Sequence, residues 1–382
     1  LFLIITVISA LLLTTGCDLF IKTNKGQVDQ KWYMGLTYED DNGNDTDYTI
    51  GTDGTIAAVA LEDGYGDEFG IIKGEEAYLN INTIIKNIDK RFYVDATNNL
   101  VMFTDATKTY KTKIGGKTIN ETENTDYVIS FMDGKNCYVN VKFVKKYVDF
   151  DYKVVKAEGK SPARIVLKYT SGEKNQMTVK SNIEMRTKAD YQNLIVTTLK
   201  KNTKVTVLEE SGDWTKVGTD DGFMGYVPAK KLKDKETKKT EFKSDADTYT
   251  HVLMNKKISL GWNAITNLTA NGNLETIIEH TKGLNVISPT WYSLSDNKGN
   301  LRSYASATYV EKAHSKGLKV WALVNDFGTQ DKASKEYTKK VLTDTTKREN
   351  LVDNIMTNIK DYNLDGINID FEFINKDIIN SY

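Results

Sequence analysis

The stretch Asp365-Gly-Ile-Asn-Ile-Asp-Phe-Glu372 decides the fold of the last third of this 382-residue chain. Apolar and polar residues alternate along it, and the polar ones are Asn368, Asp370 and Glu372. Successive side chains of a strand point to opposite faces, so these three share one face. A carboxylate is rarely buried without a partner, because its desolvation is costly. The alternation therefore predicts a strand whose polar face serves a function.

A helix is predicted directly before this strand. Asp344 and Thr345 can cap it, and its apolar residues recur at helical spacing: Leu351, Val352, Ile355, Met356, Ile359 and Tyr362. A helix that leads into an internal strand is the unit of a (β/α)8 barrel, whose active residues lie at the C-terminal ends of the strands. Glu372 lies at that end.

At these residues the chain resembles glycoside hydrolase family 18, the chitinase-like barrels. The family's fourth strand carries Asp-Gly, two spaced acidic positions and a terminal catalytic Glu. Asp365, Gly366, Asp370 and Glu372 match, while Asn368 stands where the family usually has a third Asp. The alternative is a strand with an accidental acidic end, but three further barrel strands upstream favour the functional interpretation.

The resemblance implies a substrate-assisted mechanism without a cofactor, in which the substrate's own N-acetyl carbonyl attacks the anomeric carbon. Glu372 would protonate the leaving oxygen, with a pKa raised by burial and by its neighbour's charge. Asp370 would hold the acetamide N–H and stabilise the oxazolinium cation. Asn368 can form hydrogen bonds but cannot ionise.

Three earlier strands of the barrel are expected at 257–264, 284–294 and 318–326, with helices at 274–280 and 306–316. Large aromatic side chains at a barrel mouth can stack on sugar rings. The expected substrate-binding residues are Trp262, Trp291, Tyr292, Trp321 and Asn325. Trp321, in mid-strand, could equally pack in the core. The third strand lacks Ser-x-Gly-Gly, which favours the branch resembling spore and cell-wall glucosaminidases.

Only 132 residues remain from His251 to the last residue, whereas eight βα units need roughly 250. We therefore expect residues 251–382 to be the N-terminal half of a family 18 TIM barrel. The chain is then a fragment of a longer product, and it would be inactive as written.

Residues 1–17 resemble a bacterial lipoprotein signal peptide. Leu1 to Leu13 are almost wholly apolar, and Thr14-Thr-Gly-Cys17 resembles a lipobox, whose cysteine is diacylated. The alternatives, an ordinary secretion signal or an uncleaved anchor, also export the protein. We expect an exported protein, anchored by lipid at Cys17 to the outer face of the bacterial cytoplasmic membrane at the cell wall, with a polar tether over residues 18–30.

Residues 31–176 are expected to form an α+β repeat domain, with copies near 77–104 and 137–170. Ala77-Tyr-Leu-Asn-Ile81 corresponds to Cys137-Tyr-Val-Asn-Val141 at an offset of 60 residues. Each copy reads as strand, short helix, strand. The pattern resembles the copper-amine-oxidase N-terminal-like repeats of bacterial surface proteins, and no copper is implied. A binding or spacer role is expected.

Residues 177–233 resemble the bacterial Src-homology-3-like (SH3-like) domain. Short β-rich runs between turns predict a small all-β barrel. The resemblance rests on Arg186, Gly212-Asp-Trp214 and Gly225-Tyr-Val-Pro228. Such domains commonly hold an enzyme against peptidoglycan peptides, so cell-wall peptides are expected partners. Residues 234–250 are expected to be a linker. The lysine-dense stretch from Lys230 to Lys243 has an alternative interpretation, a salt-screened and unspecific attraction to anionic wall polymers.

Composition narrows the function. A net charge of −1 and the lack of a basic domain argue against nucleic-acid binding, and three scattered histidines argue against a zinc site. Two functions remain for this multidomain chain. One is a surface-anchored hydrolase of β-1,4-linked N-acetylglucosamine in peptidoglycan or chitin-like glycans. The other is a non-catalytic wall-binding protein. Glu372 favours the hydrolase, because lectin-like relatives usually lack the acid.

Overall fold

The computed structural model describes residues 23–105, 108–243, 254–327, 332–374, 376 and 378. Cys17 and the expected signal peptide lie outside these residues. The chain divides into two compact units, residues 1–92 with 112–246 and residues 93–111 with 247–382. Among the described residues, no helix has the length and apolar character needed to cross a membrane.

The first unit contains a seven-stranded sheet of mixed direction in the order β11-β12-β5-β4-β3-β14-β13. Only β14 and β3 pair in parallel within it. The strands are β3 (Thr55–Ala60), β4 (Gly70–Lys73), β5 (Glu76–Asn80), β11 (Ser130–Asp133), β12 (Asn136–Asn140), β13 (Asp151–Val155) and β14 (Ala163–Lys168).

Two helices with the same local structure follow β5 and β12, namely α3 (Ile81–Asn87) and α4 (Val141–Tyr147). Asn80 and Asn140 cap them, each accepting a 2.9 Å hydrogen bond from the N–H two residues on. Strands β5 and β12 pair antiparallel with Leu79 opposite Val139, which are 60 residues apart. The corresponding strands therefore face each other across an approximate two-fold axis. Cys137 is buried here, and burial raises its pKa to about 12.

Residues 93–111 belong to the second unit, so the expected repeat domain over 31–176 is not continuous. Strands β6 (Phe92–Asp95), β7 (Leu100–Thr104) and β8 (Thr109–Lys113) form a sheet of their own. The reason is a set of long-range hydrogen bonds. The N–H of Thr345 donates to the buried Asp95 carboxylate at 2.6 Å, and Asn98 donates to Asp344 at 3.0 Å.

A second seven-stranded sheet, in the order β17-β16-β20-β19-β18-β15-β21, contains five strands that lie within the expected SH3-like domain. Its buried core includes Val205, Val217 and Val227. The five strands are β16 (Ile183–Arg186), β17 (Ile195–Leu199), β18 (Lys204–Ser211), β19 (Trp214–Gly218) and β20 (Met224–Pro228).

Two segments expected to be connectors are instead part of this structure. Residues 234–240 continue strand β21 (Leu232–Thr240), which pairs with β15 (Gly172–Val179). The ladder uses backbone groups and needs no apolar side chains, and ion pairs such as Lys235–Glu210 (2.8 Å) support it. Within the expected tether, Gly26 and Val28 exchange 2.9 Å backbone hydrogen bonds with Ile195, before the short helix α2 (Gln30–Tyr33).

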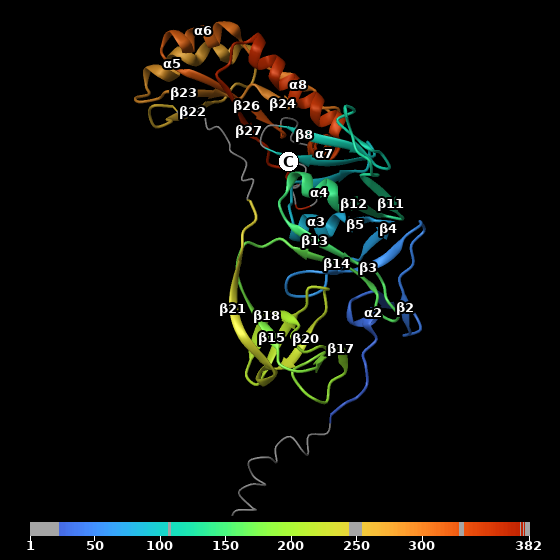
Figure 1. Ribbon diagram of the computed structural model, residues 1–382. Coiled ribbons are helices and arrows are strands. Elements are labelled where there is room, and N and C mark those ends of the chain that lie inside the picture. The colour runs from blue at the N-terminus through green and yellow to red at the C-terminus, as the bar shows by residue number, and fades with distance from the viewer. Residues whose placement is uncertain are drawn as a thin grey trace, which may run out of the picture. The chain divides into compact units, whose positions relative to one another are not determined.

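The second unit is built on a parallel sheet whose neighbours β22, β23, β26 and β27 follow in chain order. Helices α5, α6 and α8 lie along one side of it (Figure 1). Val320, Ala322 and Val324 of β26 pack with residues of these helices. The elements are β22 (Leu260–Asn263), α5 (Leu274–Glu279), β23 (Val286–Pro289), β24 (Tyr292–Leu294), β25 (Leu301–Ser303), α6 (Ala307–Ser315), β26 (Lys319–Asn325), α7 (Lys332–Leu342), α8 (Thr345–Asp361) and β27 (Gly366–Asp370).

We expect Asn140→Ala to lower the free energy of unfolding of the first unit by about 1 to 2 kcal/mol. The side chain caps α4 and also donates to Glu76 at 3.0 Å from a fully buried position. Urea unfolding followed by circular dichroism measures the change. Asn136→Ala, at the exposed start of the same strand, is the matched control, and equal effects of the two variants would contradict this account.

Candidate active site

Polar residues gather on the face of the parallel sheet that points away from its helices. Paired residues of neighbouring parallel strands point to the same side. The register places Trp262 beside Ser288, Ser293 beside Asn325, and Asn325 beside Asp370. We call this surface the polar face; its members are Trp262, Ser288, Ser293, Asn325, Asn368 and Asp370. The period-two pattern of the sequence thus places Asn368 and Asp370 together on one side of β27.

Asn325 is the most enclosed of the expected site residues on this face. It is 6% exposed, and among the described residues its Oδ1 has no hydrogen-bond partner. Beside it, Ser293 accepts a 3.0 Å hydrogen bond from Arg302. Asn368 donates to Ser288 at 3.4 Å across the sheet. A buried acceptor without a donor is costly, so this part of the face is suited to a ligand hydroxyl or N–H.

Glu372 lies two residues beyond the end of β27 and is exposed. It lines an open pocket of about 350 Å³, together with Phe373 and Ile374 and with Lys335, Glu336 and Lys339 of α7. Asp370 and Asn368 are not among the lining residues. The structure therefore brings Glu372 next to the lysines of α7 and does not place it in a hollow shared with Asp370.

Asp326, which the sequence did not nominate, holds the backbone at Glu372. Its fully buried carboxylate accepts the N–H of Glu372 at 2.9 Å and that of Phe373 at 3.1 Å. The only signal in the sequence was an acid at the last position of the third expected strand, adjacent to the nominated Asn325. Sequence spacing gave no sign that this acid reaches the backbone of another strand.

Asp365 and Gly366, the first residues of the motif, fix β27 against β26. Asp365 forms an ion pair with Lys319 (2.8 Å), is hydrogen-bonded to His314 (2.7 Å) and accepts the N–H of Val320 (2.9 Å). Burial acts to raise the pKa of Asp365, but the hydrogen bonds from Lys319, Val320 and His314 outweigh it and hold the pKa below its usual value. A Cβ on Gly366 would lie 2.9 Å from the Trp321 ring, so this position needs glycine.

The four expected aromatic contacts separate into one exposed ring, two core residues and one half-buried ring. Trp262 is 69% exposed on the polar face. Trp291 is fully buried, donates to Asn271 at 2.8 Å and packs edge-on against Tyr309. Tyr292 is buried in the same cluster. Trp291 and Tyr292 have no free face for a sugar ring, so the structure corrects their expected role. Trp321 is half-buried over Gly366.

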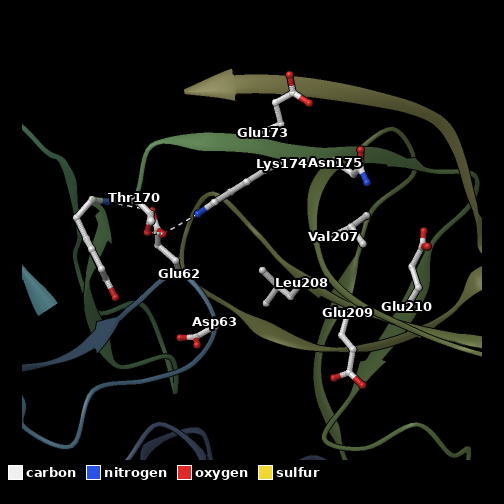
Figure 2. Close-up of a pocket in the computed structure, with 11 residues that line it drawn as sticks. Glu62, Asp63, Thr170, Glu173, Lys174, Asn175, Val207, Leu208, Glu209 and Glu210 are labelled. Atoms are coloured by element: carbon white, nitrogen blue, oxygen red, sulfur yellow. Dashed lines mark hydrogen bonds and ion pairs between the residues drawn. The ribbon is translucent and has the colours of Figure 1, made fainter. Parts of the chain in front are cut away.

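The first unit has a separate, acidic pocket of about 500 Å³. Figure 2 shows Lys174 reaching Glu62 across it. Burial acts to raise the pKa of Glu62, but hydrogen bonds from Lys174, Thr170 and Tyr169 outweigh it and lower the pKa. Glu62 therefore joins two segments of the unit. Among the described residues, no group of His, Cys, Asp and Glu side chains is arranged to hold a metal ion.

Comparison with known proteins identifies one domain of the chain. Residues 181–233 match the family model described as Bacterial SH3 domain. The chain therefore contains a bacterial SH3 domain. A comparison with curated proteins finds no match.

Solved chitinase structures are similar to part of the chain. The C-terminal domain of a protein described as a chitinase from Desulfitobacterium hafniense is 25% identical, covers 31% of this chain and 34% of that one, and has a TM-score of 0.26. A chitinase from Bacteroides thetaiotaomicron is 21% identical, with coverages of 31% and 37% and a TM-score of 0.26. A class V enzyme from Pseudomonas fluorescens is 22% identical, with coverages of 30% and 35% and a TM-score of 0.25. The chain thus spans about a third of the length of these structures.

Two substitutions of the same residue type test the assignment of the aromatic rings. We expect Trp291→Ala to lower the free energy of unfolding of the second unit by about 3 to 5 kcal/mol, because it empties a fully packed site. Trp262→Ala should change it by less than about 0.5 kcal/mol, because the ring is exposed. Urea titration of both variants measures the two free energies of unfolding. A large loss of stability in Trp262→Ala would contradict the assignment of that ring to the surface.

We expect Asp365→Asn to destabilise the second unit at pH 7 by about 1.5 to 3 kcal/mol, the range for hydrogen bonds to a charged group. Because folding lowers the pKa of Asp365, its stabilisation is present above about pH 4 and is lost as the pH falls through the folded-state pKa. The difference from wild type should therefore shrink towards pH 2.5. Urea titrations at both pH values, with the exposed Asp353→Asn as control, measure it; a pH-independent difference would refute the ion-pair role.

Proposed function

We propose that the second unit carries the catalytic acid of a glycoside hydrolase acting on β-1,4-linked N-acetylglucosamine in peptidoglycan or chitin-like glycans. One observation carries the proposal. Asp370 and Glu372 lie at the carboxyl end of β27, the last of four parallel strands that follow in chain order. In α/β barrels this end of the strands carries the active residues. The exposed Trp262 ring on the polar face gives a sugar a surface on which to stack.

In the proposed reaction, Glu372 donates its proton to the glycosidic oxygen as the bond from that oxygen to the anomeric carbon breaks. The carbonyl oxygen of the substrate's N-acetyl group forms the new bond to the anomeric carbon, which gives a cyclic oxazolinium ion. Asp370 accepts the acetamide N–H and offsets the positive charge. Water then attacks the anomeric carbon while the Glu372 carboxylate takes a proton from it, so the configuration is retained and the acid is restored.

The parallel sheet is proposed to be the first half of a (β/α)8 barrel in a longer protein. Four parallel neighbours in chain order with intervening helices are the start of that topology. Among the described residues β27 pairs with β26 alone, and Ile369 on it is 44% exposed. A further βα unit would cover this apolar edge, which would otherwise favour aggregation.

The other parts of the chain are proposed to hold the enzyme at the wall. The bacterial SH3 domain at 181–233 would bind cell-wall peptides, and the α+β region would act as a spacer or a further binding module. Export with a lipid on Cys17 would keep the protein on the outer face of the membrane. Neither nucleic acid nor a cofactor is required.

We expect Glu372→Gln in the full-length protein to reduce glycan hydrolysis by about 10²- to 10⁴-fold, the contribution of a positioned general acid. Binding of the glycan should be retained, because the side chains are nearly the same size. Release of reducing sugar from peptidoglycan and from chitin oligomers is the measurement. Glu336→Gln, the other acid that lines the pocket, is the matched control. Unchanged sugar release by Glu372→Gln would rule out the assignment.

A non-catalytic wall-binding protein is the second candidate. It is favoured by the exposure of Glu372 and by a pocket that Asp370 does not line. The same assay separates the two functions. A wild-type protein that binds peptidoglycan but releases no reducing sugar is a binding protein.

A further inference from the structure

We propose that Asp326 is a positioning residue, which fixes the backbone of Glu372 and so aims its side chain. The inference rests on the proposed function, because it assigns a support to the acid of that site. Asp326 is the residue directly after β26, and β26 is the strand that pairs with β27. It has no part in the chemistry described above.

The geometry is that of one carboxylate shared by three donors. Oδ1 accepts the N–H of Glu372 at 2.9 Å, and Oδ2 accepts the N–H of Phe373 at 3.1 Å. The hydroxyl of Thr338 on α7, also fully buried, donates to Oδ2 at 2.9 Å. Asp326 thus ties the segment after β27 to both β26 and α7.

The burial of Asp326 makes its hydrogen bonds to the segment after β27 energetically necessary. Its side chain is fully enclosed. A buried carboxylate must be compensated by hydrogen bonds to its charged form. Here the compensation comes from two consecutive backbone amides and one hydroxyl. The segment that carries Glu372 can therefore move away only by leaving the buried carboxyl oxygens of Asp326 without their backbone donors.

The position of these bonds along the strand explains why they are needed. The ladder between β26 and β27 ends with the pair Asn325 and Asp370. Beyond it, no strand pairing within the described residues holds Glu372, and its side chain is exposed. The carboxylate of Asp326 binds the backbone N–H groups two and three residues beyond Asp370, the last paired residue. An exposed acid on the segment beyond the ladder thereby gains a fixed backbone.

Fixing the backbone bears on catalysis because a general acid must be placed closely. A productive site requires its groups to be held within about 0.5 Å, and a misplacement of 1 Å can cost about 100-fold in rate. The N–H of Glu372 belongs to the peptide unit before this residue, and the N–H of Phe373 belongs to the unit after it. The two hydrogen bonds therefore orient both peptide planes that flank the Cα of Glu372. Together these planes determine the direction in which the Glu372 side chain leaves the chain.

The test uses Asp326→Asn in the full-length protein. An amide side chain has one acceptor oxygen and presents an NH₂ group to the other donor, so only one of the two backbone bonds can persist. Hydrogen–deuterium exchange, resolved to the amides of Glu372 and Phe373, should quicken by at least about 10-fold. In the same protein kcat should fall by about 10- to 100-fold, while KM stays within about 3-fold of the wild-type value.

Thr338→Val removes only the hydroxyl that supports Oδ2, so it should give a smaller change in the same direction. It also keeps the test open if Asp326→Asn does not fold. Asp353→Asn, an exposed acid on α8, should leave exchange, kcat and KM unchanged.

Unchanged exchange at both amides in Asp326→Asn and Thr338→Val would overturn the positioning role, as would a rise in KM with kcat unchanged. Failure of the proposed function gives a different result. If Glu372→Gln does not reduce sugar release, the hydrolase assignment fails, and the exchange measurement alone still decides whether Asp326 fixes this segment.

Discussion

Strand β27 is held against β26 by a carboxylate at each end. At its start, Asp365 of the β27 segment reaches across to the N–H of Val320 and to Lys319. At its far end, Asp326 of the β26 segment reaches back to the N–H groups of Glu372 and Phe373. Between them runs the parallel ladder from Trp321–Gly366 to Asn325–Asp370. The placement of Asn325, Asn368 and Asp370, and of Glu372 just beyond them, depends on this clamped pair of strands.

The sequence predicted the strand and its faces because side-chain direction in a strand follows from a period of two. Asn368 and Asp370 therefore lie on one face, as expected. Burial of the aromatic residues was not predictable in the same way. The expected strand at 284–294 is interrupted, and β23 and β24 meet β26 at different points. Trp291 falls at the interruption, where alternation no longer indicates which way a ring points.

Features that depend on contacts between residues far apart in the chain could not be predicted from the sequence either. The 60-residue repeat predicted the local strand and helix of each copy, yet residues 93–111 pack with the second unit through Asp95 and Thr345. The composition of the lysine-dense segment at 234–240 is that of a linker. Its pairing with β15 uses backbone hydrogen bonds, which do not require any particular residue type. The surroundings of Glu372 could not be predicted for the same reason, because they are formed by α7 and by Asp326.

If Cys17 carries the proposed lipid, the first residues held by the SH3 domain limit how far that domain can lie from the membrane. Asn24 already donates its N–H to the carbonyl of Tyr191, and it is only seven positions after Cys17. Seven residues span at most about 25 Å even when fully extended. A lipid on Cys17 would therefore keep the start of the SH3 domain close to the membrane surface. The SH3 domain would then meet the wall layer closest to the bilayer, and access to more distant glycan strands would depend on the rest of the protein.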